Sequence, residues 1–262
     1  MKIGLSTSIF KGETLEFILK MATYLEMDWL EIKTELLRES MDEAAELILS
    51  KPEYSKIDNF SVHSAHKNLN LVNIKPEQIE RHEKDLDFAR KIGSDRVVLH
   101  AGYSADGNHD EELEIIIPTI EHYLDYTEGT DIQILLENTM FGRNKLCSDT
   151  RELRSVLKNI DHPRLGATLD IINLLGVKEE KQKKRYKKIK EWVRHIHINS
   201  LPVYQGEFKM KKFVKYFLKE LKFKKKLKKE KEEKYNIPVI LEGKTSLARE
   251  MQFYNDLCRR LK

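Results

Sequence analysis

The sequence predicts a single-domain α/β protein, a (β/α)8 TIM barrel over residues 1–262, on the strength of three observations. Short apolar runs alternate with helical patterns along the whole chain, as in βα units built around a parallel sheet. Eight runs and eight helical patterns in 262 residues match the count and size of this barrel. After the first run, LSTSIFKGETLEF lacks the glycine-rich phosphate turn that is usual in a doubly wound open sheet.

The apolar runs have the length and the polar boundaries of buried parallel strands. They predict strands over residues 2–6, 29–33, 60–63, 96–100, 132–137, 165–170, 194–199 and 237–242. Helical periodicity predicts helices over about 13–26, 41–51, 76–92, 111–126, 149–159, 179–191, 208–233 and 246–261. Asp149, with Glu152 three residues later, predicts a capping box at the start of the fifth helix.

Composition predicts a soluble cytoplasmic protein. No stretch reaches the roughly 18–20 apolar residues of a membrane span, and MKIGLSTSIFKGE has too short an apolar run for a signal peptide. The two cysteines, Cys147 and Cys258, fit a reducing cytosol better than a disulfide framework. Charged residues make up 34% of the chain, with abundant Lys, Glu and Ile, a bias found in thermophilic proteins.

Positive charge is concentrated in two segments. Residues 178–190 hold eight Lys or Arg against two Glu, and residues 207–234 hold thirteen Lys against five Glu. An apolar stripe through Phe213, Phe217 and Leu221 predicts that the second segment is an outer helix with a Lys-rich helical extension. A solvated helix face is the simplest interpretation, and attraction to a nucleic-acid backbone is the alternative.

Six consecutive predicted strands, the third to the eighth, have a histidine or a carboxylate at or near their C-terminal ends. These residues are His63, His100, Glu137, Asp170, His197 and Glu242. Because the C-terminal strand ends of a TIM barrel meet at the face that carries active sites, we expect the six side chains to converge there. So many buried ionisable groups need a cation, and their donor atoms suit Zn²⁺, Mn²⁺ or Fe²⁺. The sequence therefore predicts a divalent metal site at the barrel mouth.

The remaining histidines show no such placement. His66 lies three residues beyond His63 and is a candidate for the site. The other five are expected to be structural or exposed: His82, His109, His122, His162 and His195. If its strand is regular, His195 is expected to lie on the opposite strand face from the mouth.

Segments near these strand ends carry a family resemblance. They are VHSAHKNLNL, VVLHAG, ILLENTMFG, LGATLDIIN, RHIHINS and VILEGK, in this order from the third strand to the eighth. The chain resembles the xylose-isomerase-like TIM barrel superfamily, which includes sugar epimerases such as tagatose 3-epimerase, and endonuclease IV among the AP endonucleases of family 2.

The epimerase branch implies one divalent ion (Zn, Mn or Co) held by Glu137, Asp170, His197 and Glu242. By this resemblance, Glu137 and Glu242 act as catalytic base and acid on opposite faces of an enediolate formed from a keto-sugar. The endonuclease IV branch implies two zincs, one held by His63, His100 and Glu137, with Glu137 shared with the second, and cleavage of DNA at abasic sites.

Two departures from endonuclease IV favour the isomerase. Asn173 stands where that enzyme has a histidine for its third zinc, and SLPVYQGEF contains no Asp-x-His pair for the same ion. A histidine is also frequent at the Asn173 position in epimerases. The DNA-cleaving enzyme is the alternative, and a barrel that binds metal or sugar without catalysis is a third possibility, against which the six retained ligands argue.

Several polar residues next to the strand ends are expected to bind substrate, with ordinary loop contacts as the alternative. They are His66, Asn138, Asn173, Asn199 and Lys244, and Arg143 is placed similarly. Asn138 has a second expected role, in which its hydrogen bonds orient a metal ligand.

Overall fold

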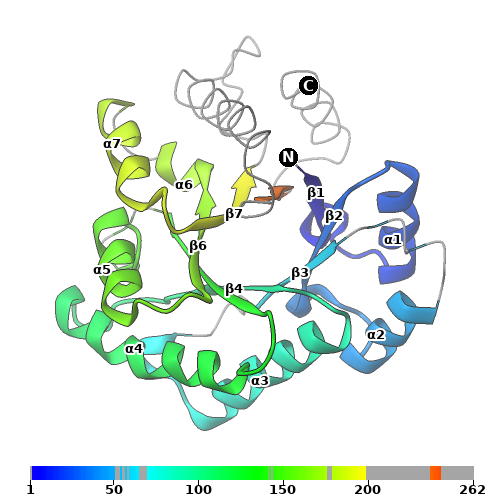
Figure 1. The fold of residues 1–262 in the computed structure, drawn as a ribbon, viewed down its shortest axis with the longest axis horizontal. Coiled ribbons are helices and arrows are strands. Elements are labelled where there is room, and N and C mark those ends of the chain that lie inside the picture. The colour runs from blue at the N-terminus through cyan, green and yellow to red at the C-terminus, as the bar shows by residue number, and fades with distance from the viewer. Residues whose placement is uncertain are drawn as a thin grey trace.

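The computed structural model describes residues 2–50, 54, 57, 59–64, 70–140, 142, 144–175, 179–198 and 237–242. Eight parallel strands close into a barrel in chain order, with β8 paired to β1. The helices lie around the outside of the strands (Figure 1). The predicted (β/α)8 barrel is therefore confirmed.

The strands coincide closely with the predicted apolar runs. They are β1 (Ile3–Ser6), β2 (Trp29–Lys33), β3 (Asn59–His63), β4 (Arg96–His100), β5 (Gln133–Glu137), β6 (Leu165–Asp170), β7 (Val193–Ile198) and β8 (Val239–Leu241). Their register brings the polar strand ends together: His100 is the partner of Glu137 across β4 and β5, and Asp170 is the partner of His197 across β6 and β7.

Six helices lie where helical periodicity predicts them, and α6 is an addition. The helices are α1 (Leu15–Tyr24), α2 (Met41–Ser50), α3 (Pro76–Lys91), α4 (His109–Tyr126), α5 (Thr150–Ile160), α6 (Ile171–Leu175) and α7 (Glu179–Ile189), with short 3-10 turns η1 (Thr7–Phe10), η2 (Thr34–Leu36) and η4 (Leu71–Asn73). In this described part of the chain, no helix has the length and hydropathy needed to cross a membrane. The helices predicted at 208–233 and 246–261, and the Lys-rich extension at 207–234, lie outside the described residues.

The start of α5 differs in one detail from the predicted capping box. Asp149 caps the helix as expected, since its side chain accepts a hydrogen bond from the backbone N–H of Arg151. The side chain of Glu152 does not accept the second hydrogen bond of a capping box, from the backbone N–H of Asp149. Its carboxylate contacts Nδ1 of His109 at 3.0 Å, because the neighbouring start of α4 brings that ring within reach.

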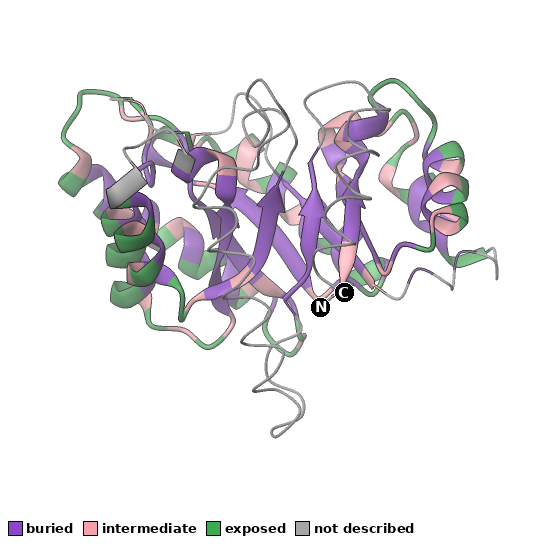
Figure 2. Cartoon of the chain, turned by 90° about the horizontal axis from the view of Figure 1, so that it is seen from above, coloured by how far each residue is buried: buried purple, intermediate pink, exposed green. Residues whose placement is uncertain are grey.

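Successive residues of a strand point alternately to the layer between strands and helices and to the inside of the barrel, as β2 shows. Leu30 and Ile32 belong to the apolar core that packs the strands against the helices. Trp29, Glu31 and Lys33 lie on the other face, inside the barrel, where Glu31 contacts β7 and Lys33 contacts the residue after β8. Figure 2 shows the strands buried and the exposed residues on the outer surfaces of the helices. The strand period of two thus separates a packing face from a face that carries polar groups.

A β-bulge in β7 sets the direction of its two histidines. The register with β6 shifts so that Ala167 pairs with Val193 and Thr168 pairs with His195, which leaves Arg194 as an extra residue. Beyond this bulge His195 and His197 are two positions apart, so they point to the same face. The expectation that His195 faces away from the mouth residues is therefore wrong, because both rings contact Glu31 inside the barrel.

Loops that follow β3, β4 and β5 are tied together near the barrel mouth. The side chain of Asn70 accepts a hydrogen bond from the N–H of Tyr103 at 3.0 Å and donates one to its carbonyl at 2.7 Å. Tyr103 also forms an antiparallel bridge with Lys145. Gly102, at φ +99°, lies directly against Asn70, and a β-carbon there would collide with that side chain.

A Gly102→Ala variant is expected to be destabilised by about 3 kcal/mol, since it adds this collision to the strain of a positive φ. Gly107→Ala is the matched control: its φ is +87° and nothing lies within 4 Å of the added carbon. This control should lose only the stability that backbone strain costs, about 1 kcal/mol in the free energy of unfolding. Urea unfolding of both variants measures the difference, and equal losses would contradict the close packing of the two loops.

Candidate metal centre

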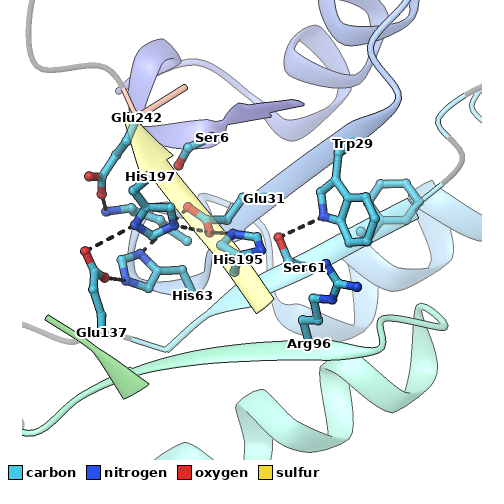
Figure 3. Close-up of polar contacts among 12 residues, drawn as sticks. Ser6, Trp29, Glu31, Ser61, His63, Arg96, Glu137, His195, His197 and Glu242 are labelled. Carbon is cyan, nitrogen blue, oxygen red and sulfur yellow. Dashed lines mark hydrogen bonds and ion pairs between the residues drawn. The ribbon is translucent and has the colours of Figure 1, made fainter. Parts of the chain in front are cut away.

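Five of the six predicted ligands gather at the C-terminal end of the barrel, together with two residues of the interior. They form three groups in which the possible ligand atoms lie within 4.8 Å of one another: His63, His100 and Glu137; Glu137, His197 and Glu242; and Glu31, His195 and His197. Figure 3 shows most of these side chains pointing toward one another from different strands. Glu137 and His197 each belong to two groups, so they link the whole cluster.

Glu137, the last residue of β5, is the centre of the cluster. One carboxylate oxygen, Oε2, lies 3.2 Å from Nε2 of His63 and 2.9 Å from Nε2 of His100. The other, Oε1, lies 3.2 Å from Nδ1 of His197. Glu137 is 3% exposed, so these imidazoles provide its polar surroundings in place of water.

The imidazoles keep Glu137 ionised. Burial alone would raise the pKa of this carboxyl, but the charge of His197, followed by that of His100, outweighs burial and holds the pKa well below 4.5. Burial would lower the pKa of His197, whereas Glu31 and Glu137 on its two sides raise it well above 6.5. The ionised carboxylate of Glu137 can therefore donate an oxygen to a metal ion and can accept a proton.

Glu242 follows β8 and is paired with Lys33 from the end of β2. The Lys33 ammonium contacts Oε1 of Glu242, and the two side chains are 15% and 8% exposed. Burial raises the pKa of Glu242, but the charge of Lys33 and then of His197 lowers it below its usual value. Burial would lower the pKa of Lys33, and the glutamates Glu242 and Glu31 reverse this effect, so its pKa is raised. The mouth thus contains an ion pair as well as the expected ligands.

Glu31 and Lys33 are functional candidates that the sequence analysis missed. Glu31 is completely buried, and its Oε2 lies 3.0 Å from Nε2 of His195 and 2.8 Å from Nε2 of His197. The signal was present in WLEIK, where the charged residues occupy alternate positions of a strand. Such alternation places both on one face, and a charge inside a buried strand needs a partner.

Asp170 lies at the end of β6 but is outside the three groups found among the described residues. Its Oδ1 accepts hydrogen bonds from the backbone N–H of Ile172 at 2.6 Å and of Asn173 at 3.2 Å, at the start of α6. In the sheet register it is the partner of His197. Its role as a metal ligand remains a prediction.

Asn138 and Asn173 are buried beside Asp170. Asn138 accepts a hydrogen bond from the N–H of Asp170 at 2.8 Å and donates to its carbonyl at 3.1 Å. Asn173 donates to the carbonyl of Asn138 at 2.8 Å. These contacts support the orienting role expected for Asn138, and substrate binding by either residue stays a prediction.

Other candidates are placed as follows. His82 is buried against Oγ of Ser64 at 2.7 Å, and His122 contacts Glu83 at 2.8 Å on the outer helices, in agreement with structural roles. Four of the residues considered for substrate binding lie outside the described part of the chain: His66, Arg143, Asn199 and Lys244.

The residues present fit a divalent cation. Glu31, Glu137 and Glu242 have lowered pKa values and are ionised at neutral pH, whereas Lys33 is protonated. Without an ion, the raised pKa of His197 lets its imidazolium balance part of this charge. A ligating imidazole has to give up that proton, and the three glutamates and Lys33 would then leave two negative charges, which is the charge that one divalent ion supplies. Imidazole nitrogens mixed with carboxylate oxygens are the donors that Zn²⁺, Mn²⁺ and Co²⁺ accept.

Solved structures with the same fold include enzymes that act on sugars. A D-tagatose 3-epimerase-like protein is 20% identical (TM-score 0.73), and 3-keto-D-glucoside 4-epimerase from E. coli is 16% identical (TM-score 0.74); each match covers 100% of this chain and 98% of the other. The IOLI protein with a bound zinc atom is 15% identical (TM-score 0.70), and the match covers 100% of this chain and 98% of that protein. At these identities the likeness shows the shared barrel fold.

A curated relative matches over a shorter segment. The probable endonuclease 4 of Acholeplasma laidlawii (strain PG-8A) is 28% identical over 98 residues, which is 36% of this chain and 33% of that protein. The family described as xylose isomerase-like TIM barrel matches residues 15–257, nearly the whole chain. The chain therefore belongs to the xylose isomerase-like TIM barrel family.

Proposed function

We propose that the protein is a divalent-metal-dependent isomerase or epimerase that acts on a keto-sugar or a related small carbohydrate through an enediolate. One observation carries the proposal: two ionised carboxylates, Glu137 and Glu242, form a single group with the imidazole of His197 at the barrel mouth. Isomerisation needs one group to remove a proton from carbon and another to return one. An ionised carboxylate can accept the proton, and the second carboxylate can return one after it has taken up a proton from solvent or from a substrate hydroxyl.

The ligand set proposed for the ion is Glu137, Asp170, His197 and Glu242. A bound divalent ion would polarise the substrate carbonyl and acidify the neighbouring C–H bond. Glu137 would accept the proton, since the imidazoles around it keep its carboxylate ionised. Lys33 would hold Glu242 in place through their ion pair, so that the second carboxylate stays directed toward the mouth.

The comparisons support the same class of reaction. The names of two of the similar structures are those of sugar epimerases or their relatives, and a third contains a zinc atom. The experiment is to load the metal-free protein with Zn²⁺, Mn²⁺ or Co²⁺ and incubate it in D₂O with a panel of ketopentoses, ketohexoses and their phosphates. Deuterium entering substrate or product is the expected result, and no exchange with any sugar would contradict the proposal.

A zinc-dependent nuclease that cleaves DNA at abasic sites is the second candidate. It is favoured by the group of His63, His100 and Glu137, which could hold a further zinc with Glu137 as the shared ligand. The curated relative is named a probable endonuclease 4, although the match spans only about a third of it. The absence of the third-zinc residues from the sequence, with Asn173 in place of a histidine, argues against this candidate.

Incubation of the zinc-loaded protein with a duplex that contains one abasic site decides between the two. The isomerase proposal expects neither nicking nor salt-sensitive binding. Nicking that requires two zincs per chain would establish the nuclease instead.

A further inference from the structure

Glu31 is a buried carboxylate that no part of the proposed reaction uses. It lies in the middle of β2, is 0% exposed, and contacts two imidazoles of β7 through the same oxygen. The distances from this Oε2 are 3.0 Å to His195 and 2.8 Å to His197 (Figure 3). Burying a charge this deep in a barrel is costly unless hydrogen bonds and opposite charges compensate for the loss of water.

The contact with Glu31 engages one nitrogen of the His197 ring and leaves the other facing the mouth. A carboxylate accepts hydrogen bonds, so Nε2, the ring nitrogen that faces Glu31 at 2.8 Å, donates a hydrogen to it. The opposite nitrogen, Nδ1, points to Oε1 of Glu137 at 3.2 Å, toward the group of Glu137, His197 and Glu242. The interior carboxylate therefore directs one defined nitrogen of His197 to the mouth.

We propose that Glu31 is the positioning residue of the metal centre: it holds His197 through Nε2 so that Nδ1 is the atom that binds the ion. This inference rests on the proposed metal site and adds a residue that the ligand set does not contain. A carboxylate behind a ligating histidine fixes the orientation of the ring and strengthens its basicity, and loss of such a partner costs roughly 10–100-fold in metal affinity.

His195 and His63 complete the surroundings of Glu31. His195 shares Oε2 and is held nearly perpendicular to His197, with the ring planes at 82°. The other oxygen, Oε1, faces Nδ1 of His63 at 4.0 Å. A second ion between Glu31, His195 and His197 would require His197 to give up its remaining proton and bridge two metals, whereas hydrogen bonds account for the observed distances without that step.

The test compares metal affinity in the 262-residue chain after removal of bound ions. Zn²⁺ is titrated in competition with a chromogenic chelator into wild type, Glu31→Gln and the control Glu83→Gln. Glu83 also contacts an imidazole, that of His122 at 2.8 Å, but on the outer helices. Glu31→Gln is expected to bind Zn²⁺ about 10–100-fold more weakly, and Glu83→Gln is expected to match wild type.

A second measurement covers the case in which Glu31→Gln does not fold. The ¹⁵N shifts of the His197 ring in zinc-loaded wild type are expected to show hydrogen on Nε2 and zinc on Nδ1. Zinc on Nε2, or a folded Glu31→Gln variant that binds Zn²⁺ as tightly as wild type, would overturn the role of Glu31 while the proposed function stands. Wild type that binds no divalent ion would overturn both.

Discussion

Glu137→Gln is expected to abolish solvent-deuterium incorporation into the substrate of the metal-loaded protein. Glutamine has nearly the same shape but cannot accept a proton from carbon, and loss of a general base typically costs about 10²–10⁴-fold in rate. Mass spectrometry of the sugar after incubation in D₂O measures the exchange. Because Glu137 is also a proposed ligand, the assay is run at saturating metal, with the bound ion quantified in the same sample.

Glu112→Gln is the control for this substitution. Glu112 is likewise buried, at 3% exposure, but it lies in α4 and accepts a hydrogen bond from the backbone of Ala105. Its amide variant keeps an acceptor oxygen and should retain full exchange activity. Undiminished deuterium exchange in metal-loaded Glu137→Gln would remove this residue from the proton transfer and would contradict the proposed mechanism.

Lys33→Met is expected to lower the free energy of unfolding of the metal-free protein by about 3 kcal/mol. The substitution keeps an unbranched side chain but removes the charge that pairs with Glu242, and a buried ion pair broken on one side leaves an uncompensated charge. Saturating Zn²⁺ should recover part of the loss, since an ion bound at the mouth neutralises Glu242 in another way.

Lys91→Met provides the surface comparison. Lys91 pairs with Asp42 at 2.9 Å, but the two side chains are 43% and 85% exposed, so little stability depends on that contact. Urea unfolding with and without Zn²⁺ should therefore show a large, metal-sensitive loss only for Lys33→Met. Equal and small losses in both variants would mean that Lys33 does not balance the charge of the mouth.

The sequence was sufficient to predict the barrel and most of the cluster because both follow from local patterns. Each apolar run corresponds to one strand, and the residue at its C-terminal end lies at the mouth because all strands of this barrel are parallel. His63, His100, Glu137, His197 and Glu242 could be placed in this way without knowledge of any contact. The helix α6 was missed because five residues are too few to establish a helical period.

Contacts across the barrel could not be predicted in the same way. Glu31 and His195 are separated by 164 residues, and a glutamate between two apolar neighbours gave no sign of its partner. The spacing of His195 and His197 already placed the two rings on one face, since side chains two residues apart in a strand point the same way. The bulge at Arg194 could be recognised only from the register with β6. The hydrogen bonds that engage Asn138 depend likewise on the pairing of strand ends.

The proposed reaction and the proposed role of Glu31 both require that the mouth holds a divalent ion between Glu137, His197 and Glu242. Anomalous diffraction from crystals grown with Zn²⁺ or Mn²⁺, combined with metal analysis of the same protein, tests it most directly. We expect one tightly held ion per chain, with a carboxylate oxygen of Glu137, Nδ1 of His197 and a carboxylate oxygen of Glu242 among its ligands. An ion bound only by His63 and His100, or no ion at the mouth, would contradict it.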